Sequence, residues 1–292
     1  MQTEIASRIA NSLGVELIAA EAARPTEHPD AFDYILRGRA VQFKPSSRDV
    51  FVEAIGWYER ALALDPQSVE AMSLLANAFV GRVDDAMTGS RAADIARAEG
   101  LVDQVLAASP RSGYAHLVKG KVLKKQNRFE EASLEFERSL ALNPNWVLSL
   151  NQLAQCRLFT GSIEEAVPLE QQAIRLSPRD PAIGWWYRVI GTVDLLQSRT
   201  EEAIVLLEKA RSEIPAAPIV REHLAAAYGL KGDFGRAGAE LAEARRLAGG
   251  DYLSSIAKMK KGDTWRSFSP KTRGLYEAII FAGLRKAGVP EE

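Results

Sequence analysis

A short phrase that ends in proline recurs along the chain, and it constrains the fold more than any other feature. The copies that end at Pro110, Pro144 and Pro178 stand 34 residues apart. Self-similarity at a fixed period of roughly 20–50 residues is typical of arrays built from one small structural unit. The copies read ALALDP, VLAASP, SLALNP, AIRLSP and SEIP and end at Pro66, Pro110, Pro144, Pro178 and Pro215, with a degenerate RRLAG that ends at Gly249.

Small residues occupy two fixed places in each unit. An alanine lies twelve residues before the end of every copy, and a Gly or Ala lies earlier still. Because small residues let two helices approach closely, we expect each unit to be a pair of helices, A and then B, whose backbones meet at these places. The proline then ends helix B. The alanines are Ala54, Ala98, Ala132, Ala166, Ala203 and Ala237, and the earlier small residues are Gly38, Ala76, Gly120, Ala154, Gly191 and Ala225.

The pattern predicts an all-α chain of about six helix pairs, with no β-sheet. Repeated pairs stack on their neighbours, so the two ends of the array need caps. Ile5, Ile9, Leu13 and Leu17 recur every four residues, which is the stripe of an amphipathic helix. The predicted regions are an N-terminal capping helix within 1–30, repeats over 31–68, 69–112, 113–146, 147–180, 184–217 and 218–251, and C-terminal capping helices within 252–292.

Aromatic residues complete the pattern. Phe79 and Tyr228 fall in helix A of their units, and Tyr58 and Phe136 fall in helix B. Together with the small residues, the terminal proline and the period, they resemble the tetratricopeptide repeat (TPR) over Ala31 to Asp251. The resemblance implies a right-handed helical solenoid that serves as a protein-interaction scaffold and has no catalytic site of its own.

The segments that flank the repeats carry a second resemblance. EIASRIANSLGVELIAAEAAR, HPDAFDYILRGRA and the closing GLRKAGVPEE are similar to the C-terminal half of certain bacterial class III adenylate/guanylate cyclase-like proteins. That resemblance implies that the chain is the regulatory arm of a larger signalling protein. Three alternatives stay open: a stand-alone TPR adaptor, the TPR arm of a winged-helix transcriptional regulator, and an enzyme with an unrecognised site.

Composition and motifs argue against several other classes. The net charge is −1, so no global field recruits nucleic acid or an anionic membrane. No stretch approaches 18 uninterrupted apolar residues, and the single cysteine, Cys156, forms no internal disulfide, which fits the cytoplasm. His28, His116 and His223 lie at no metal-ligand spacing, and no phosphate-binding Gly-rich motif is present. We therefore expect no metal and no cofactor.

The TPR resemblance also implies where a partner binds. In that family, ligand contacts come mostly from helix A, along the inner groove of the solenoid. Carried onto this chain, they predict a peptide-binding groove with His223 beside it. Its residues are Arg39, Ser73, Asn77, Tyr114, Lys121, Lys124, Lys125, Asn151, Gln155, Trp185, Arg188, Thr192 and Glu222.

Basic residues gather in one of these helices. Lys121, Lys124, Lys125 and Arg128 are spaced to share one side of it. Such a cluster can attract an acidic peptide or a terminal carboxylate. An ordinary solvated basic face explains the same spacing, and the sequence leaves both interpretations open.

Amides and tryptophans supply two further hypotheses. Asn77, Asn151 and Gln155 can hold an extended peptide backbone by paired hydrogen bonds, or they are plain polar surface. Trp185 and Trp186 are either binding anchors or packing between repeats. The apolar helices expected at both ends also make a homodimer a hypothesis.

Overall fold

The structure is a computed structural model that describes residues 16–24 and 29–292. Every regular element in this part of the chain is a helix and none is a strand, which confirms the predicted all-α class. The chain divides into two compact units, Met1–Pro144 and Asn145–Glu292, which we call unit 1 and unit 2. Most of the predicted N-terminal helical stripe lies outside the described residues. Residues 16–22, which include Leu17, are helical.

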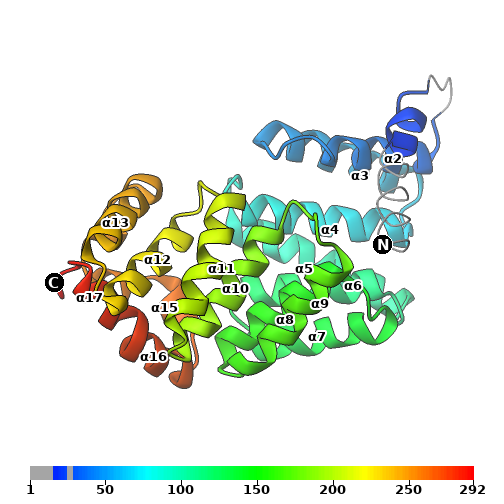
Figure 1. The fold of residues 1–292 in the computed structure, drawn as a ribbon. Coiled ribbons are helices and arrows are strands. Elements are labelled where there is room, and N and C mark those ends of the chain that lie inside the picture. Colours follow the sequence, from blue (N-terminus) through cyan, green and yellow to red (C-terminus); the bar gives the residue numbers. More distant parts are fainter. Residues whose placement is uncertain (1–15, 25–28) are drawn as a thin grey trace. The chain divides into compact units, whose positions relative to one another are not determined.

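Unit 1 is built from three antiparallel helix pairs (Figure 1). In each pair an A helix packs on the B helix that follows it, and α3 also packs on α4 as α5 does on α6. Serine caps begin several of these helices: Ser47, Ser68, Ser90 and Ser112 each accept a hydrogen bond from a backbone N–H of the first turn. The pairs are α2 (Ala31–Gln42) with α3 (Arg48–Leu64), α4 (Val69–Asp84) with α5 (Arg91–Ala108), and α6 (Gly113–Lys125) with α7 (Phe129–Leu142).

Unit 2 repeats the arrangement with three more pairs. Asp233 caps the last B helix by accepting from the N–H of Arg236. Ser162, at the start of the first B helix of this unit, makes no side-chain cap bond, and the Glu165 side chain pairs with Arg157. The pairs are α8 (Val147–Thr160) with α9 (Ile163–Leu176), α10 (Ile183–Leu196) with α11 (Thr200–Glu213), and α12 (Pro218–Lys231) with α13 (Phe234–Ala248).

The repeated small residues make room for helix B in two ways. All six helix-B alanines are fully buried. At Gly120 an added Cβ would lie 2.5 Å from the Phe136 ring, and at Gly38 it would overlap the Tyr58 ring, so these two glycines leave room for a large side chain of helix B. At Gly191 the added Cβ would lie 2.9 Å from Leu207 and 3.3 Å from the backbone oxygen of Ala203, so the backbone of helix B also comes close there.

The C-terminal segment of unit 2 doubles back along the A helices. After α13 come η1 (Tyr252–Ser254), which lies against α13, and then α14 (Ile256–Met259) and α15 (Asp263–Ser267). The sequence predicted capping helices here, and the last three elements pack along the A helices: α16 on α8, η2 on α10 and α12, and α17 on α12. Those three are α16 (Pro270–Leu275), η2 (Tyr276–Phe281, a π-helical turn) and α17 (Ala282–Lys286).

Candidate interaction surfaces

The predicted groove residues lie on the A helices of both units, and each unit is described by itself. We call the A-helix face of unit 1 the surface formed by Arg39, Asn77, Lys121, Lys124 and Lys125. We call the A-helix face of unit 2 the surface formed by Asn151, Gln155, Arg188, Thr192 and Glu222.

In unit 1, polar side chains of successive A helices pair with one another. Arg39 forms an ion pair with Glu70 of α4, with 3.2 Å between Nη1 and Oε1. Lys121 of α6 donates from Nζ to Oδ1 of Asn77, 2.7 Å away.

Lys125, one turn further along α6, forms an ion pair with Asp84 at the end of α4. Burial lowers the pKa of Lys121, and the nearby Asp84 opposes that shift. The face therefore carries both signs of charge, arranged in pairs that bridge neighbouring repeats.

The basic cluster seen in the sequence is divided by the fold. Lys121 and Lys125 lie against α4, whereas Arg128 follows the end of α6 and pairs with Glu131 of α7 and, at 3.8 Å, with Glu99 of α5. Lys124 is half-buried. The prediction that Arg128 shares one side with the lysines is wrong, because the helix ends at Lys125 and the chain turns before Arg128.

Two other predicted contact residues of unit 1 are largely enclosed. Ser73 is buried, and its hydroxyl donates to the carbonyl of Val69 one turn earlier. Tyr114 is half-buried, and burial raises the pKa of its phenol to about 12. Arg39 and Glu70 both lie close enough to influence that pKa, so Tyr114 belongs to the floor of the face.

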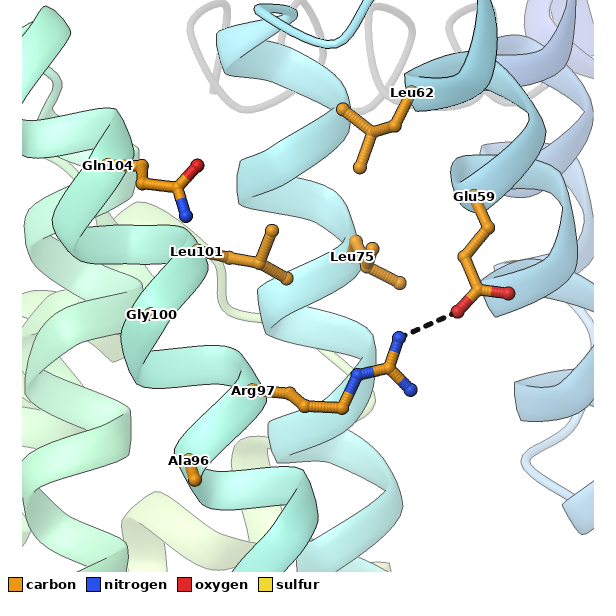
Figure 2. Close-up of a pocket in the computed structure, with 8 residues that line it drawn as sticks. All are labelled: Glu59, Leu62, Leu75, Ala96, Arg97, Gly100, Leu101 and Gln104. Carbon is orange, nitrogen blue, oxygen red and sulfur yellow. Dashed lines mark hydrogen bonds and ion pairs between the residues drawn. The ribbon is translucent and has the colours of Figure 1, made fainter.

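A shallow pocket of about 360 Å³ lies on the B-helix side of unit 1, between α3 and α5 (Figure 2). Leu62, Leu75 and Leu101 give it an apolar floor. At its edge Arg97 donates to Glu59, with 2.8 Å between Nη2 and Oε1. Among the residues that line the pocket, the charges of Arg97 and Glu59 are paired with each other. The pocket therefore offers room for an apolar side chain and few polar groups that could select a ligand.

In unit 2 the amides of α8 are drawn into an internal network. Asn151 is buried and donates to the carboxylate of Glu170 over 2.8 Å, and Gln155 donates to the Asn151 side-chain carbonyl over 2.8 Å. Glu170 has no exposed surface. The side-chain amides of Asn151 and Gln155 are therefore already hydrogen-bonded within unit 2, which argues against the hypothesis that they bind a peptide backbone.

The next A helices bring Arg188, Thr192, Glu222 and His223 together. The Thr192 hydroxyl donates to the Arg188 carbonyl and lies 2.9 Å from Nδ1 of His223. Because that hydroxyl hydrogen is engaged, Nδ1 of His223 must carry the proton and donate to the Thr192 oxygen. In neutral His223 the other ring nitrogen, Nε2, is then an acceptor, and it is buried without a partner.

Charges in this group lack direct counter-charges. Burial raises the pKa of Glu222 to about 8, and burial together with Arg188 lowers the pKa of His223 to about 3. Glu170 acts on Arg188 only at a distance, where it opposes the lowering of the Arg188 pKa by burial. In the described part of unit 2, no side-chain ion pair or hydrogen bond is formed by Arg188 or Glu222; Arg188 is half-buried with its Nε enclosed, and its guanidinium lies over the Trp185 ring. At neutral pH the group therefore holds one unpaired cation beside a protonated acid.

The remaining sequence candidates divide between surface and core. Trp185 is 40% exposed and lies 5.7 Å from the Arg188 guanidinium, whereas Trp186 is buried. Cys156 is fully buried. In the part of the chain that the structure describes, no three His, Cys, Asp or Glu side chains form a group able to hold a metal ion, and none of the helices there is long and apolar enough to span a membrane.

Sequence reasoning missed the depth of His223 and its contact with Tyr276 of the C-terminal segment, whose ring lies 6.1 Å from the imidazole. One signal was available: three residues before each small residue of helix A, unit 1 has Ile35, Ser73 and Leu117, whereas unit 2 has Asn151, Arg188 and Glu222. Polar residues at a place that is apolar or small elsewhere mark the face that the C-terminal segment covers.

Comparison with known proteins agrees with this architecture. Residues 90–145 and 117–181 match the tetratricopeptide repeat family. No curated protein matches the chain in sequence. A solved structure titled "Crystal structure of APC/C hetero-tetramer Cut9-Hcn1" superimposes with a TM-score of 0.68 at 16% identity, over 88% of this chain and 46% of that one. The chain thus spans less than half the length of that structure.

Two bacterial structures are similar in fold over most of their own length. PilF of Pseudomonas aeruginosa gives a TM-score of 0.58 at 18% identity, covering 79% of this chain and 96% of that one. TTC0263, a thermophilic TPR protein of Thermus thermophilus, gives 0.51 at 19% identity, covering 68% and 98%. The chain therefore contains tetratricopeptide repeats and has the all-helical, TPR-type solenoid fold.

Proposed function

We propose that the chain is a non-catalytic interaction scaffold that binds a protein or peptide partner on the A-helix face of unit 1. One observation carries the proposal. That face presents paired polar side chains from three successive A helices, and in the described part of unit 1 the elements packed closely on α2, α4 and α6 are the repeat helices themselves. The equivalent face of unit 2 is covered by the chain's own C-terminal segment.

The pairing on this face suits reversible binding. An exposed ion pair such as Arg39 with Glu70 contributes only about 0.2–1 kcal/mol, so its exchange for a partner's charges costs little. Because the face carries both signs, we expect a partner segment with both acidic and basic side chains rather than a purely acidic one. Tyr114, half-buried beneath it, supplies apolar contact area.

Charge reversal tests this assignment with a matched control. A partner captured by the purified chain should bind the Arg39→Glu, Lys125→Glu variant at least about tenfold more weakly. Arg97→Glu breaks a similarly exposed Arg–Glu pair, on the B-helix side of the same unit, and should leave the affinity unchanged. If both variants bind equally well, the A-helix face of unit 1 is not the partner site.

The flanking motifs support a finer proposal. On their strength we propose that the chain acts as the regulatory arm of a larger cyclase-like signalling protein of the cytoplasm. The alternatives are a stand-alone adaptor and the arm of a winged-helix regulator. An immunoblot of the native lysate separates them: a band well above 32.0 kDa supports an arm, and a band at that mass supports an adaptor.

Partners other than proteins are not part of the proposal. The net charge of −1 favours neither nucleic acid nor an anionic membrane as a partner. A homodimer through the end helices remains a separate hypothesis. Light scattering at high concentration tests it, and a monomeric mass would rule it out.

A further inference from the structure

The first helix pair of unit 1 carries a stacked aromatic pair. Tyr34 of α2 and Trp57 of α3 have ring centroids 5.7 Å apart and an interplanar angle of 21°. Both side chains are half-buried. Tyr34 lies four residues before the small residue of its helix, Gly38, and Trp57 lies three residues after the small residue of its helix, Ala54. The same two places can therefore be found in every other repeat.

In later repeats these two places face the repeat before. In the last repeat they hold Arg221 and Glu240, whose Nη1 and Oε2 atoms lie 2.9 Å apart. Glu240 is buried and also pairs with Arg211 of α11, the B helix of the preceding repeat. In the second repeat the place in the B helix holds Leu101, which lines a pocket together with Leu62 of α3, again the preceding B helix (Figure 2). The first repeat presents the same places at the start of the array, where the described chain has no helix pair before α2.

Two arginines border the aromatic pair. The guanidinium of Arg37 lies 5.3 Å from the centre of the Trp57 ring, and that of Arg60 lies 4.6 Å from it. Among the described residues, neither arginine forms an ion pair or a hydrogen bond through its side chain, so both charges are unpaired there. A Cβ added at Gly56, one turn before Arg60, would meet nothing within 4 Å, so the surface beside the ring is open. We call the surface formed by Tyr34, Arg37, Gly56, Trp57 and Arg60 the start face of unit 1.

The chain's own N-terminal segment has the features that such a face would bind. The predicted stripe runs from Ile5 to Leu17, and an acidic residue, Glu21, continues its row one turn later. In the helical residues 16–22 the Leu17 side chain is 69% exposed, so these residues leave their apolar side in solvent. A single short helix is marginal in water, and an amphipathic one is stabilised by packing its apolar side on another element. Glu21 forms an exposed ion pair with Arg24, which is weak enough to exchange for another cation.

Chain order gives this segment the place of a B helix before α2. Within unit 1, α4 and α6 each follow a B helix after a short turn, residues 65–68 and 109–112, and pack on that helix. Residues 23–30 join the N-terminal helical residues to α2, and a linker of this length spans up to about 26 Å, enough for the chain to reverse. Because the segment then runs antiparallel to α2, its last turns lie beside the start of α2, where Tyr34 stacks on Trp57.

We propose that the start face of unit 1 is a docking surface for the chain's own residues 1–24, which bind it as an amphipathic helix in the place of a preceding repeat. The stripe packs on the aromatic pair, and the carboxylates of Glu16 and Glu21 complement the two arginines. This docking is separate from partner binding on the A-helix face. Arg37 and Arg39 are two residues apart and so lie on opposite sides of α2, and Arg39 faces α4.

The reactivity of a cysteine on the start face tests the proposal in the full chain. Gly56→Cys, in a chain whose Cys156 is changed to alanine, places a thiol in the open space beside the ring. Ile9→Asp together with Leu13→Asp, which we call the stripe variant, should make this thiol react about tenfold faster, whereas Asn11→Asp, off the stripe, should leave the rate unchanged. Equal rates in the three chains would mean that the segment does not cover the face and would overturn the proposal.

A fluorescent peptide with the sequence of residues 1–24 tests the contacts. It should bind the stripe variant, and it should bind the wild-type chain at least about tenfold more weakly, because the tethered segment competes there. In the stripe variant, Arg37→Glu with Arg60→Glu should weaken the peptide about tenfold, whereas Arg48→Glu, exposed at the other end of α3, should not. A peptide that does not bind the stripe variant, or binds it regardless of the two arginines, contradicts the proposed docking. Arg39→Glu should leave the affinity unchanged, so failure here is distinct from failure of the function proposed for unit 1.

Light scattering separates the chain's own segment from that of a second copy. A monomeric wild-type chain with a protected thiol supports docking within one molecule. A wild-type dimer that becomes monomeric in the stripe variant would assign the start face to the segment of a second copy and overturn docking within the chain. Both aspartates lie outside the repeats, so the helix pairs should stay folded in the stripe variant, and circular dichroism checks this.

Discussion

Unit 1 and unit 2 share one repeat and differ in what covers their A helices. One residue after the small position of helix A, unit 1 has Arg39, Asn77 and Lys121, all partly exposed. At the equivalent places of unit 2, Gln155 of α8 is partly exposed, but Thr192 of α10 and Ala226 of α12 are fully buried. The same backbone pattern therefore gives an accessible face in one unit and an interior in the other.

The difference shows that the repeat fixes helix pairing and leaves the use of the A-helix face to a few positions. In unit 1, polar groups pair across neighbouring repeats near the surface, where the cost of opening a pair is small. In unit 2, Glu222 is buried and its pKa is raised, so its state of charge affects stability. Each prediction below tests one side of this contrast.

The largest expected effect comes from weakening the cover of unit 2. Leu284→Ala removes a fully buried side chain of α17 and should lower the free energy of unfolding of unit 2 by about 3 kcal/mol. Urea denaturation followed by hydrogen exchange resolves the two units. Leu64→Ala removes a leucine that is 57% exposed in unit 1 and should cost less than about 1 kcal/mol. Equal losses would mean that the C-terminal segment is only loosely attached.

The second effect is a pH dependence confined to unit 2. The folded pKa of Glu222 is raised from 4.5 to about 8, so between these values only the folded state keeps the proton, and stability falls as pH rises. The folded pKa of His223 is lowered from 6.5 to about 3, so stability rises with pH over that range. The two trends offset each other between pH 4.5 and pH 6.5, where both groups differ in protonation between the folded and unfolded states. Above pH 6.5 the loss of stability from Glu222 dominates.

Denaturation at several pH values measures this dependence. Unit 2 should lose about 1 kcal/mol between pH 6.5 and pH 8, and Glu222→Gln should remove the loss. Hydrogen exchange in unit 1 serves as the internal control and should not follow the same curve. A stability of unit 2 that is flat over this range in the wild-type chain would contradict the burial of an unpaired Glu222.

A third prediction compares the small residue of helix A in the two units. Gly120→Ala should destabilise unit 1 by about 1–3 kcal/mol, because the new Cβ would lie 2.5 Å from the Phe136 ring. Gly191→Ala in unit 2 faces Leu207 at 2.9 Å and should cost less, since an aliphatic side chain shifts more easily than a ring. Phe136→Leu combined with Gly120→Ala should recover part of the loss. Thermal denaturation of the three variants decides the order.

The smallest effects concern the exposed ion pairs of unit 1. Arg39→Ala and Arg97→Ala should each change the free energy of unfolding by less than about 1 kcal/mol, since each breaks one exposed pair. A melting curve for each variant checks this. A much larger loss for Arg39→Ala would mean that this pair holds α2 against α4, and its effect on binding would then reflect folding.

The sequence predicted the helix pairs well because their signals are local and repeated. The buried alanines and the all-α class were both readable from one period. The role of the small residues was predicted only in part, because a period reveals where space is short but not which atoms fill it: the rings of Phe136 and Tyr58 fill it opposite two of the glycines. The division of the basic cluster depended on where α6 ends, a boundary that spacing alone does not fix.

The candidate site was predicted less completely than the fold. Family positions identified Arg188, Thr192 and Glu222, which do lie together. Their burial could not be predicted from repeat spacing, because it comes from a segment outside the repeats that returns to α8, α10 and α12. A contact between Thr272 and Leu158 joins residues far apart in sequence, and no periodicity records it.

Accessibility at two equivalent positions tests the contrast between the units most directly. Arg39 and Thr192 each follow the small residue of their helix A, so each can be replaced by cysteine in a chain whose own buried Cys156 is changed to alanine. A thiol reagent should modify Arg39→Cys at least about 100-fold faster than Thr192→Cys, and adding Gly283→Ala, whose new Cβ would overlap backbone atoms of α12, should remove most of the difference. Equal rates of modification of Arg39→Cys and Thr192→Cys would contradict the claim that the A-helix face is open in unit 1 and filled in unit 2.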